Sequence, residues 1–173
     1  MRKLNHEEIV SRQVQKAKGA RLPLCVVLNN IRSLHNVGTI FRTADGAGVE
    51  KLWLCGITGY PPQGGIAKTA LGAQNHVPWE YREDVLGLLK ELKKVGHQIV
   101  LLEQMRGSVP HDCFEPRPPV CLVVGNEITG IAEDLPSLCD SAIEIEMEGI
   151  KNSLNVAVAF GIAVYQLRAR LKI

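Results

Sequence analysis

The sequence predicts a single α/β domain in which helices cover both faces of a parallel sheet. Strand-like runs alternate with helix-like runs along the chain, and the strand-like runs are apolar throughout. The composition agrees, because 173 residues with 46% hydrophobic and 22% charged content suit one globular domain with a sizeable core. Sheets of this kind bind ligands beyond the carboxyl ends of their strands, so the loops at those ends are the expected place for a functional site.

The first 22 residues are expected to form a basic helix or extension ahead of a domain at 23–173. Residues 1–21 hold six Lys and Arg against two Glu, and the last six residues add Arg168, Arg170 and Lys172 with no acid. Because the net charge of the chain is only +2, positive charge gathers at the two ends. This distribution fits either a solvated face or an edge that binds a polyanion such as RNA or DNA.

In the first half of the chain, two compact apolar runs predict strands, and a segment with helical spacing lies between them. Asn36 is the expected N-cap of that helix. Residues 57–80 are rich in Gly and Pro and are expected to form a long loop with a short helix around IAKTALGA. The predicted elements are a strand at 24–30, a helix at 36–48 and a strand at 51–56.

In the second half, the repeat EDVLGLLKELKKVG has helical spacing and ends in glycine, which predicts a helix at 83–96. The segment RGSVPHDCFEPRPP is expected to be a loop. The remaining predicted elements are strands at 98–104, 120–126 and 142–147, a short helix near 131–138 and a helix from about Ser153 to Leu171.

Several classes of protein are disfavoured by the absence of their motifs. No G-x-G-x-x-G follows the first strand, no Walker loop occurs, and no G-x-S-x-G elbow is present. The five cysteines are odd in number and form no C-x-x-C pair, which disfavours a disulfide framework and a zinc site. Only His35 lies beside the candidate site, and the other histidines lack ligand-like spacing, so we expect no metal.

The location of the protein is expected to be cytoplasmic. No run approaches the roughly 18 apolar residues that a membrane span needs. The N-terminal segment MRKLNHEEIVSRQVQ has no apolar core of the kind that a signal peptide requires.

Three loops at strand ends carry unusual residues: NNIRSLHN, GNEITGI and EGIKNSLN. Taken singly, each has an ordinary explanation. Asn126 and Gly130 fit a turn, and Asn36 and Ser153 fit helix caps.

Taken together, the three loops predict a site. Arg42 lies within an apolar helix, and arginine is rarely buried without a partner or a phosphate. Glu127 follows a glycine and an asparagine at a strand end, and Asn155 interrupts an Ala- and Val-rich helix start. An arginine that binds an anion, a carboxylate and an amide are therefore expected at one edge of the sheet.

The same segments resemble the three motifs of the SpoU/TrmH family of RNA 2′-O-methyltransferases, in the SPOUT class. The matching stretches are NVGTIFRTAD, LVVGNEITGI and IEMEGIKNSLNVAVA, in the family's order and separation. The resemblance covers about residues 23–168. Two positions depart from the pattern, with Glu146 where many relatives have proline and Ala157 where many have serine.

The resemblance implies an α/β knot, in which the C-terminal segment forms a deep trefoil, and a homodimer that binds S-adenosylmethionine inside each knot. It also implies that Arg42 reaches the partner's site, where it binds a phosphate and polarises the hydroxyl. Asn36, Glu127, Ser153 and Asn155 would hold this arginine and the ribose in place. By motif position, the cofactor pocket would comprise Gly125, Asn126, Ile131, Ile145, Met147 and Leu154.

The predicted function is S-adenosylmethionine-dependent methylation of a ribose 2′-hydroxyl in tRNA or rRNA, with tRNA favoured. With about 20 residues before the first strand, substrate selection is expected to rest on the catalytic domain, the dimer groove and the basic ends. The alternatives are a non-catalytic RNA-binding module of the same fold, a base-methylating relative and a small-molecule methyltransferase. Whether the segment KTALGAQNHVPW contacts RNA or packs near the interface stays open, as does proton removal by Arg42.

Overall fold

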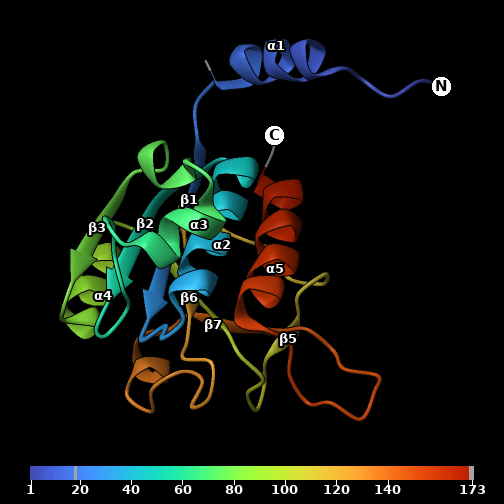
Figure 1. Cartoon of the computed structure of the whole chain (residues 1–173). Helices are drawn as coiled ribbons and strands as arrows, with labels where there is room; N and C mark the ends of the chain where they lie inside the picture. Colours follow the sequence, from blue (N-terminus) through green and yellow to red (C-terminus); the bar gives the residue numbers. More distant parts are fainter. Residues whose placement is uncertain (18, 172–173) are drawn as a thin grey trace.

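The structure is a computed structural model that describes residues 1–17 and 19–171. Its centre is a seven-stranded sheet in the order β3-β2-β1-β6-β4-β7-β5, in which every neighbouring pair is parallel (Figure 1). The strands are β1 (Leu22–Asn29), β2 (Val49–Cys55), β3 (Trp79–Arg82), β4 (Gln98–Leu102), β5 (Val109–Pro110), β6 (Val120–Val124) and β7 (Ser141–Glu144). The helices are α1 (His6–Ala17), α2 (Leu34–Ala47), α3 (Gly64–Ala70), α4 (Val85–Lys94) and α5 (Val156–Leu171), with 3-10 turns η1 (Ala73–Asn75) and η2 (Leu135–Leu138).

The side chains of the central strands enter two separate cores, one on each face of the sheet. Along β1, Leu24, Val26 and Leu28 pack with α2, α3 and α5, whereas Cys25 and Val27 pack with α4. Because both faces are covered, the side chains from Leu24 to Leu28 are all buried and all apolar, which explains the uninterrupted hydrophobic run. The predicted α/β fold with a parallel sheet is confirmed.

Two strands lie where loops were expected. β3 pairs with β2 from Trp79 to Arg82, and β5 pairs with β7 over two residues. Both are short edge strands, and their residues are partly or fully exposed. A short edge strand has only one neighbour and little apolar periodicity, so its pairing depends on the completed sheet and not on local sequence.

Two expected helix caps are wrong. The N-cap of α2 is Ser33, whose hydroxyl accepts a hydrogen bond from the backbone N–H of Asn36, so Asn36 lies inside the first turn. At α5 the capping side chain is that of Asn155 and not that of Ser153. The Asn155 Oδ1 accepts a hydrogen bond from the N–H of Ala157 at 2.9 Å. The side-chain NH2 groups of Asn36 and Asn155 make other contacts, which belong to the candidate active site.

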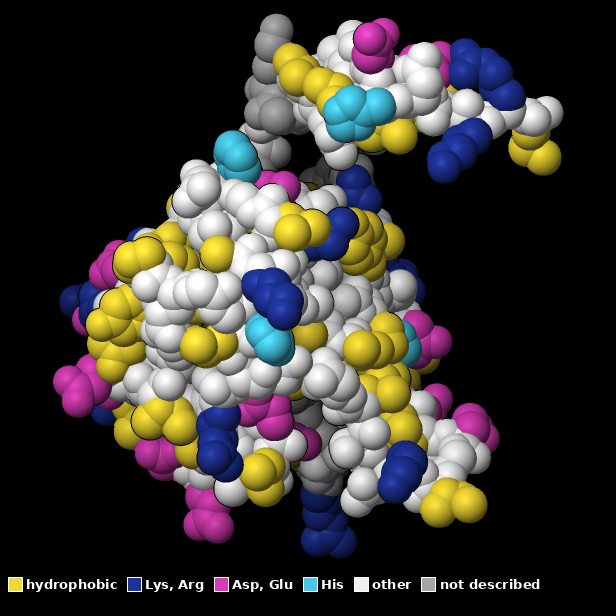
Figure 2. All heavy atoms as spheres, in the orientation of Figure 1, with side chains coloured by type: hydrophobic (Ala, Val, Ile, Leu, Met, Phe, Trp, Pro, Cys, Tyr) yellow, Lys and Arg dark blue, Asp and Glu magenta, His cyan; other side chains and the backbone are white. Residues whose placement is uncertain are grey.

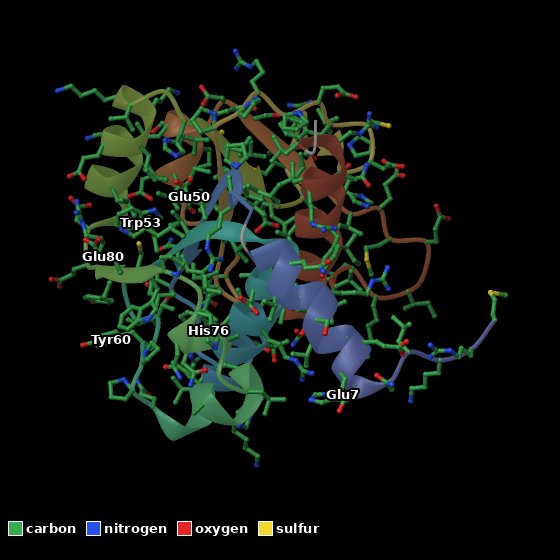
Figure 3. The ribbon with its side chains drawn as sticks, turned by 90° about the horizontal axis from the view of Figure 1, so that it is seen from above. Glu7, Glu50, Trp53, Tyr60, His76 and Glu80 are labelled. Atoms are coloured by element: carbon green, nitrogen blue, oxygen red, sulfur yellow. The ribbon has the colours of Figure 1, made fainter. Side chains whose placement is uncertain are left out.

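The segment KTALGAQNHVPW packs against α2. Ala70, Ala73 and Val77 of this segment join the larger core, while Lys68 of α3 stays exposed. On the far side of this region, Tyr60 stacks on Trp79. Figure 3 shows Tyr60 with Trp53 and Glu80 along the β2 and β3 side of the molecule, away from α5.

The N-terminal helix α1 stands apart from the sheet (Figure 1). Its start is a capping box, in which the Asn5 side chain accepts from the N–H of Glu8 and the Glu8 carboxylate accepts from the N–H of Asn5. Of the basic ends, Lys18 and Lys172 lie outside the described residues.

Within residues 1–17 and 19–171, no helix is long and apolar enough to cross a membrane. No group of three or more His, Cys, Asp or Glu side chains in the same residues is arranged to hold a metal ion. The five cysteines are free thiols, and Cys25, Cys55 and Cys121 are buried in the sheet, as their apolar surroundings in the sequence predict.

Candidate active site

A cavity of about 670 Å³ opens at the carboxyl ends of β4, β6 and β7. Its size falls within the usual range for small-molecule sites. The loops after these three strands form its walls, together with the first turn of α5. All six residues expected to bind a cofactor line it, namely Gly125, Asn126, Ile131, Ile145, Met147 and Leu154.

The loop after β6 is held as a tight turn. The backbone N–H groups of Asn126 and Gly130 each donate to the other's carbonyl at 3.0 Å. The Asn126 side chain accepts from the N–H groups of Ile128 and Thr129 and donates to the Asn30 carbonyl at 2.7 Å. This wall of the cavity is therefore pre-organised and anchored to the end of β1.

Glycine is required at two positions of this loop. Gly130 has φ +67°, and a Cβ there would collide with the Glu103 carboxylate. At Gly125 a Cβ would lie 2.5 Å from the carbonyl of Gly130. A side chain at either position would therefore distort the turn that forms this wall.

Glu127 joins the loop after β6 to the loop after β1. Its carboxylate accepts hydrogen bonds from the N–H of Arg32 at 2.9 Å, the N–H of Ser33 at 3.0 Å and the Asn36 side-chain amide at 3.0 Å. Partial burial opposes ionisation, but the three donors outweigh it, so the pKa of Glu127 lies below its ordinary value. Glu127 is consequently a fixed anion at neutral pH.

The hydrogen-bonded chain continues from Asn36 into the third motif. The Asn36 Oδ1 accepts from the Asn155 side chain at 3.2 Å, and Asn155 caps α5 through Ala157. Glu127, Asn36 and Asn155 thus form one network that we call the amide relay. It joins three segments that were predicted, from their positions at strand ends, to meet at one edge of the sheet.

Arg42 and Ser153 are not members of the amide relay. Arg42 follows Asn36 by six residues on α2, which places it about 9 Å further along the helix axis. It is exposed, and it bonds to none of the residues that the structure describes. Ser153 lies at the cavity wall with an exposed side chain.

Residues after β4 form a wall that the sequence did not single out. Glu103 accepts hydrogen bonds from the N–H groups of Ile131 and Gln104, and Gln104 donates from its side chain to the Asn152 carbonyl at 2.7 Å. The available signal was the pair of polar residues directly after the apolar run QIVLL, at the same sheet edge as the other loops.

Comparisons with known proteins agree with this geometry. The model of the SpoU rRNA Methylase family matches residues 23–165. A curated relative, the tRNA (guanosine(18)-2′-O)-methyltransferase of Aquifex aeolicus, is 35% identical over 83% of this chain and 67% of its own length. Across the curated relatives compared, the chain spans 58–67% of their length.

Solved structures give the same result. The A. aeolicus TrmH/SpoU tRNA modifying enzyme superposes with a TM-score of 0.82 at 30% identity, over 95% of this chain and 83% of that one. The AdoMet-bound rRNA methyltransferase of Sinorhizobium meliloti superposes with a TM-score of 0.80 at 29% identity, over 87% and 57% of the two chains. A family model that spans most of the chain, and a shared fold that brings its three motif segments to one sheet edge, place this protein in the SpoU/TrmH methyltransferase family.

Proposed function

We propose that the protein transfers the methyl group of S-adenosylmethionine to the ribose 2′-hydroxyl of a nucleotide in tRNA or rRNA. The observation that carries this proposal is the amide relay, which ties all three motif segments to the wall of one cavity. The A. aeolicus relative is a tRNA 2′-O-methyltransferase by name and a Vibrio parahaemolyticus relative is a 23S rRNA 2′-O-methyltransferase by name, so both RNAs are candidate substrates.

The residues around the cavity suit S-adenosylmethionine, which carries a positive sulfonium. Four carboxylates are among the lining residues, from Glu103, Glu127, Glu133 and Glu144, whereas no Lys or Arg is found among them. Apolar side chains such as Ile131 supply surface for a flat ring. The bound donor would supply an electrophilic methyl group.

The chain's own residues position the acceptor. Arg42 has the planar fork of donors that suits a phosphate next to the target ribose, and it polarises the hydroxyl. We assign phosphate binding to Arg42 as its main role, in preference to proton removal. Asn36, Asn155 and Ser153 orient the ribose at the cavity, and positioning of this kind contributes several kcal/mol to catalysis.

The active site is proposed to be shared between the two chains of a homodimer. Val158, Ile162 and Tyr165 form an apolar stripe on α5 and are 52%, 38% and 47% exposed. Gly46 of α2 lies beside the Tyr165 hydroxyl, and Arg42 is one turn from Gly46 on the exposed side of α2. A partner seated on this stripe would contact Arg42, which lacks a partner among the described residues of its own chain.

The C-terminal segment is proposed to form the trefoil knot of the family. α5 packs against α2 and β1, although it follows β7, which lies beyond β6 and β4 in the sheet. The segment between β7 and α5 must therefore return across the carboxyl edge, where Gln104 binds its Asn152 carbonyl. Residues 23–173 would be the catalytic domain, with 1–22 as an extension, acting on RNA in the cytoplasm.

The test is transfer of labelled methyl from S-adenosylmethionine to unmodified tRNA and, separately, to rRNA, with Arg42→Ala beside the wild type. We expect 2′-O-methylribose in one RNA and its loss in the variant. No label in either RNA would contradict the proposal. Cofactor binding then separates the remaining cases, because a non-catalytic RNA-binding module with a degenerate pocket would bind RNA but not S-adenosylmethionine.

A further inference from the structure

Three cationic side chains stand at the loops around the cavity: Arg32, Arg106 and Lys151. Arg32 follows β1, Arg106 follows β4 and Lys151 follows β7, and all three are exposed. Their neighbours Met105 and Asn152 line the cavity. Figure 2 shows Lys and Arg side chains projecting from the lower edge of the molecule, which Figure 1 identifies as the carboxyl edge of the sheet.

The charges of these three cations are not used within the protein. Arg32, Arg106 and Lys151 make no side-chain hydrogen bond or ion pair with the residues described in the structure. Four other cations of the domain are paired with carboxylates. The pairs are Lys51 with Glu80 at 2.8 Å, Arg82 with Glu91 at 2.6 Å, Lys93 with Asp140 at 2.9 Å and Arg170 with Glu115 at 2.6 Å.

Some cationic side chains at the basic ends of the chain already have partners within the protein. Arg2 pairs with Glu8, and Arg21 donates to the carbonyls of Val49 and His76. A cation that already has a partner must give it up to bind a phosphate. The cavity edge therefore offers cations that are available without such an exchange.

The backbone under each of the three cations is held in place. The N–H of Arg32 donates to Glu127 at 2.9 Å, and the carbonyl of Asn152, next to Lys151, accepts from Gln104 at 2.7 Å. The N–H of Ser108 donates to the Met105 carbonyl at 3.0 Å, and the Ser108 hydroxyl donates to the Glu144 carboxylate at 2.7 Å, which closes the turn that carries Arg106. Fixed loops reduce the entropy lost when the side chains bind a ligand.

The distribution of charge differs between the cavity, where we place the cofactor, and its edge, where we place the RNA. The acids lie inside the cavity, at Glu103, Glu127, Glu133 and Glu144, while the three cations stand outside it. Glu146 and Glu148 are exposed on the same loop as Lys151, so the edge has no broad positive field. Binding of RNA at this edge therefore has to use a few discrete phosphate contacts.

We propose that Arg32, Arg106 and Lys151 form a cationic rim that binds backbone phosphates of the substrate RNA on either side of the target nucleotide. The inference rests on the proposed function, since it assumes that the ribose enters this cavity. The rim holds the RNA in both the ground and transition states. It should therefore set KM and not kcat.

The test compares two triple variants of equal charge. The rim variant is Arg32→Gln with Arg106→Gln and Lys151→Gln. The control is Lys90→Gln with Lys94→Gln and Arg117→Gln, which alters exposed cations on α4 and on the loop before β6. KM, kcat and RNA affinity are measured from 50 to 200 mM salt with whichever RNA, unmodified tRNA or rRNA, the wild type methylates.

We expect the rim variant to raise KM about tenfold or more at low salt, with kcat within twofold and S-adenosylmethionine affinity unchanged. The slope of log affinity against log salt should fall by about 2, because each lost phosphate contact removes roughly 0.7 to 0.9. The control should stay within twofold of the wild type.

An unchanged KM and salt slope in the rim variant, or an equal loss in the control, would overturn the inference while leaving the proposed function intact. If the triple variant loses affinity for S-adenosylmethionine, the three single variants are measured instead. The inference then requires that at least two of them raise KM. Failure of the wild type to methylate either RNA is a different result, which removes the proposed function and the rim with it.

Discussion

Replacement of Glu127 by glutamine should destabilise the protein in a pH-dependent way. The carboxylate accepts three hydrogen bonds, two of them from the backbone N–H groups of Arg32 and Ser33. A glutamine amide has one acceptor oxygen, and its NH2 would face one of these donors. Hydrogen bonds to a charged group contribute roughly 1.5–3 kcal/mol each. Because Glu127 is largely exposed, solvent screens these hydrogen bonds. We therefore expect Glu127→Gln to lower the free energy of unfolding by about 1–2 kcal/mol in total at pH 7.

The sign of the pH dependence follows from the lowered pKa of Glu127. A carboxylate with a depressed pKa in the folded state adds stability above its unfolded pKa of about 4.3 and loses it as pH falls through the folded pKa. The difference in unfolding free energy between wild type and Glu127→Gln, measured by urea denaturation, should therefore be largest near pH 7 and should shrink below about pH 4.

Glu133→Gln provides the matched control, because Glu133 also lines the cavity but its carboxylate accepts no hydrogen bond from the described residues. That variant should stay within about 0.5 kcal/mol of the wild type at every pH. The reasoning would be refuted if Glu127→Gln were as stable as the wild type at pH 7, or if the gap between them widened as the pH fell.

Three further predictions address the rest of the site. Asn155→Ala should lower stability by about 1 kcal/mol through loss of the α5 cap and should abolish methyl transfer. Asn155→Ser should recover thermal stability without methyl transfer. Recovery of both stability and activity in Asn155→Ser would show that only the cap matters. Gly125→Ala should weaken S-adenosylmethionine binding in calorimetry by about tenfold or more, because its methyl group would displace Gly130, and normal affinity would argue against a rigid turn. Mixing refolded Arg42→Ala and Asn155→Ala chains should restore about a quarter of the wild-type activity if each site of a symmetric dimer takes Arg42 from the partner; an inactive mixture would place Arg42 and Asn155 in the same chain's site.

The central strands could be predicted from sequence because burial on both faces makes them continuously apolar, as in LCVVL of β1. The first and last residues of the helices and strands were harder to predict from sequence. The start of α2 depends on whether Ser33 or Asn36 caps it, and both residue types are good caps. The edge strand WEYR carries polar side chains and is defined by its pairing with β2, which is a tertiary property.

For the site, the sequence predicted which residues lie at strand ends but not which of them bond to one another. Asn36, Glu127 and Asn155 meet as expected, because parallel strands deliver their loops to one edge. The exposure of Arg42 could not be inferred, since an apolar helix with one arginine has the same pattern whether that side faces a core or a partner. Glu103 and Gln104 resemble the ordinary polar end of any strand.

The hydrogen bond between Asn36 and Asn155 also has a consequence for the order of folding. It joins residues 119 positions apart, so it cannot form until the last helix of the chain has been synthesised and docked. Contacts of such long range slow folding, because the closing of a long loop precedes any gain from the contact. During synthesis, the sheet can collapse around β1 and β2 well before the cavity has its final wall. The ability to bind the methyl donor would then report that the third motif has docked against the first two.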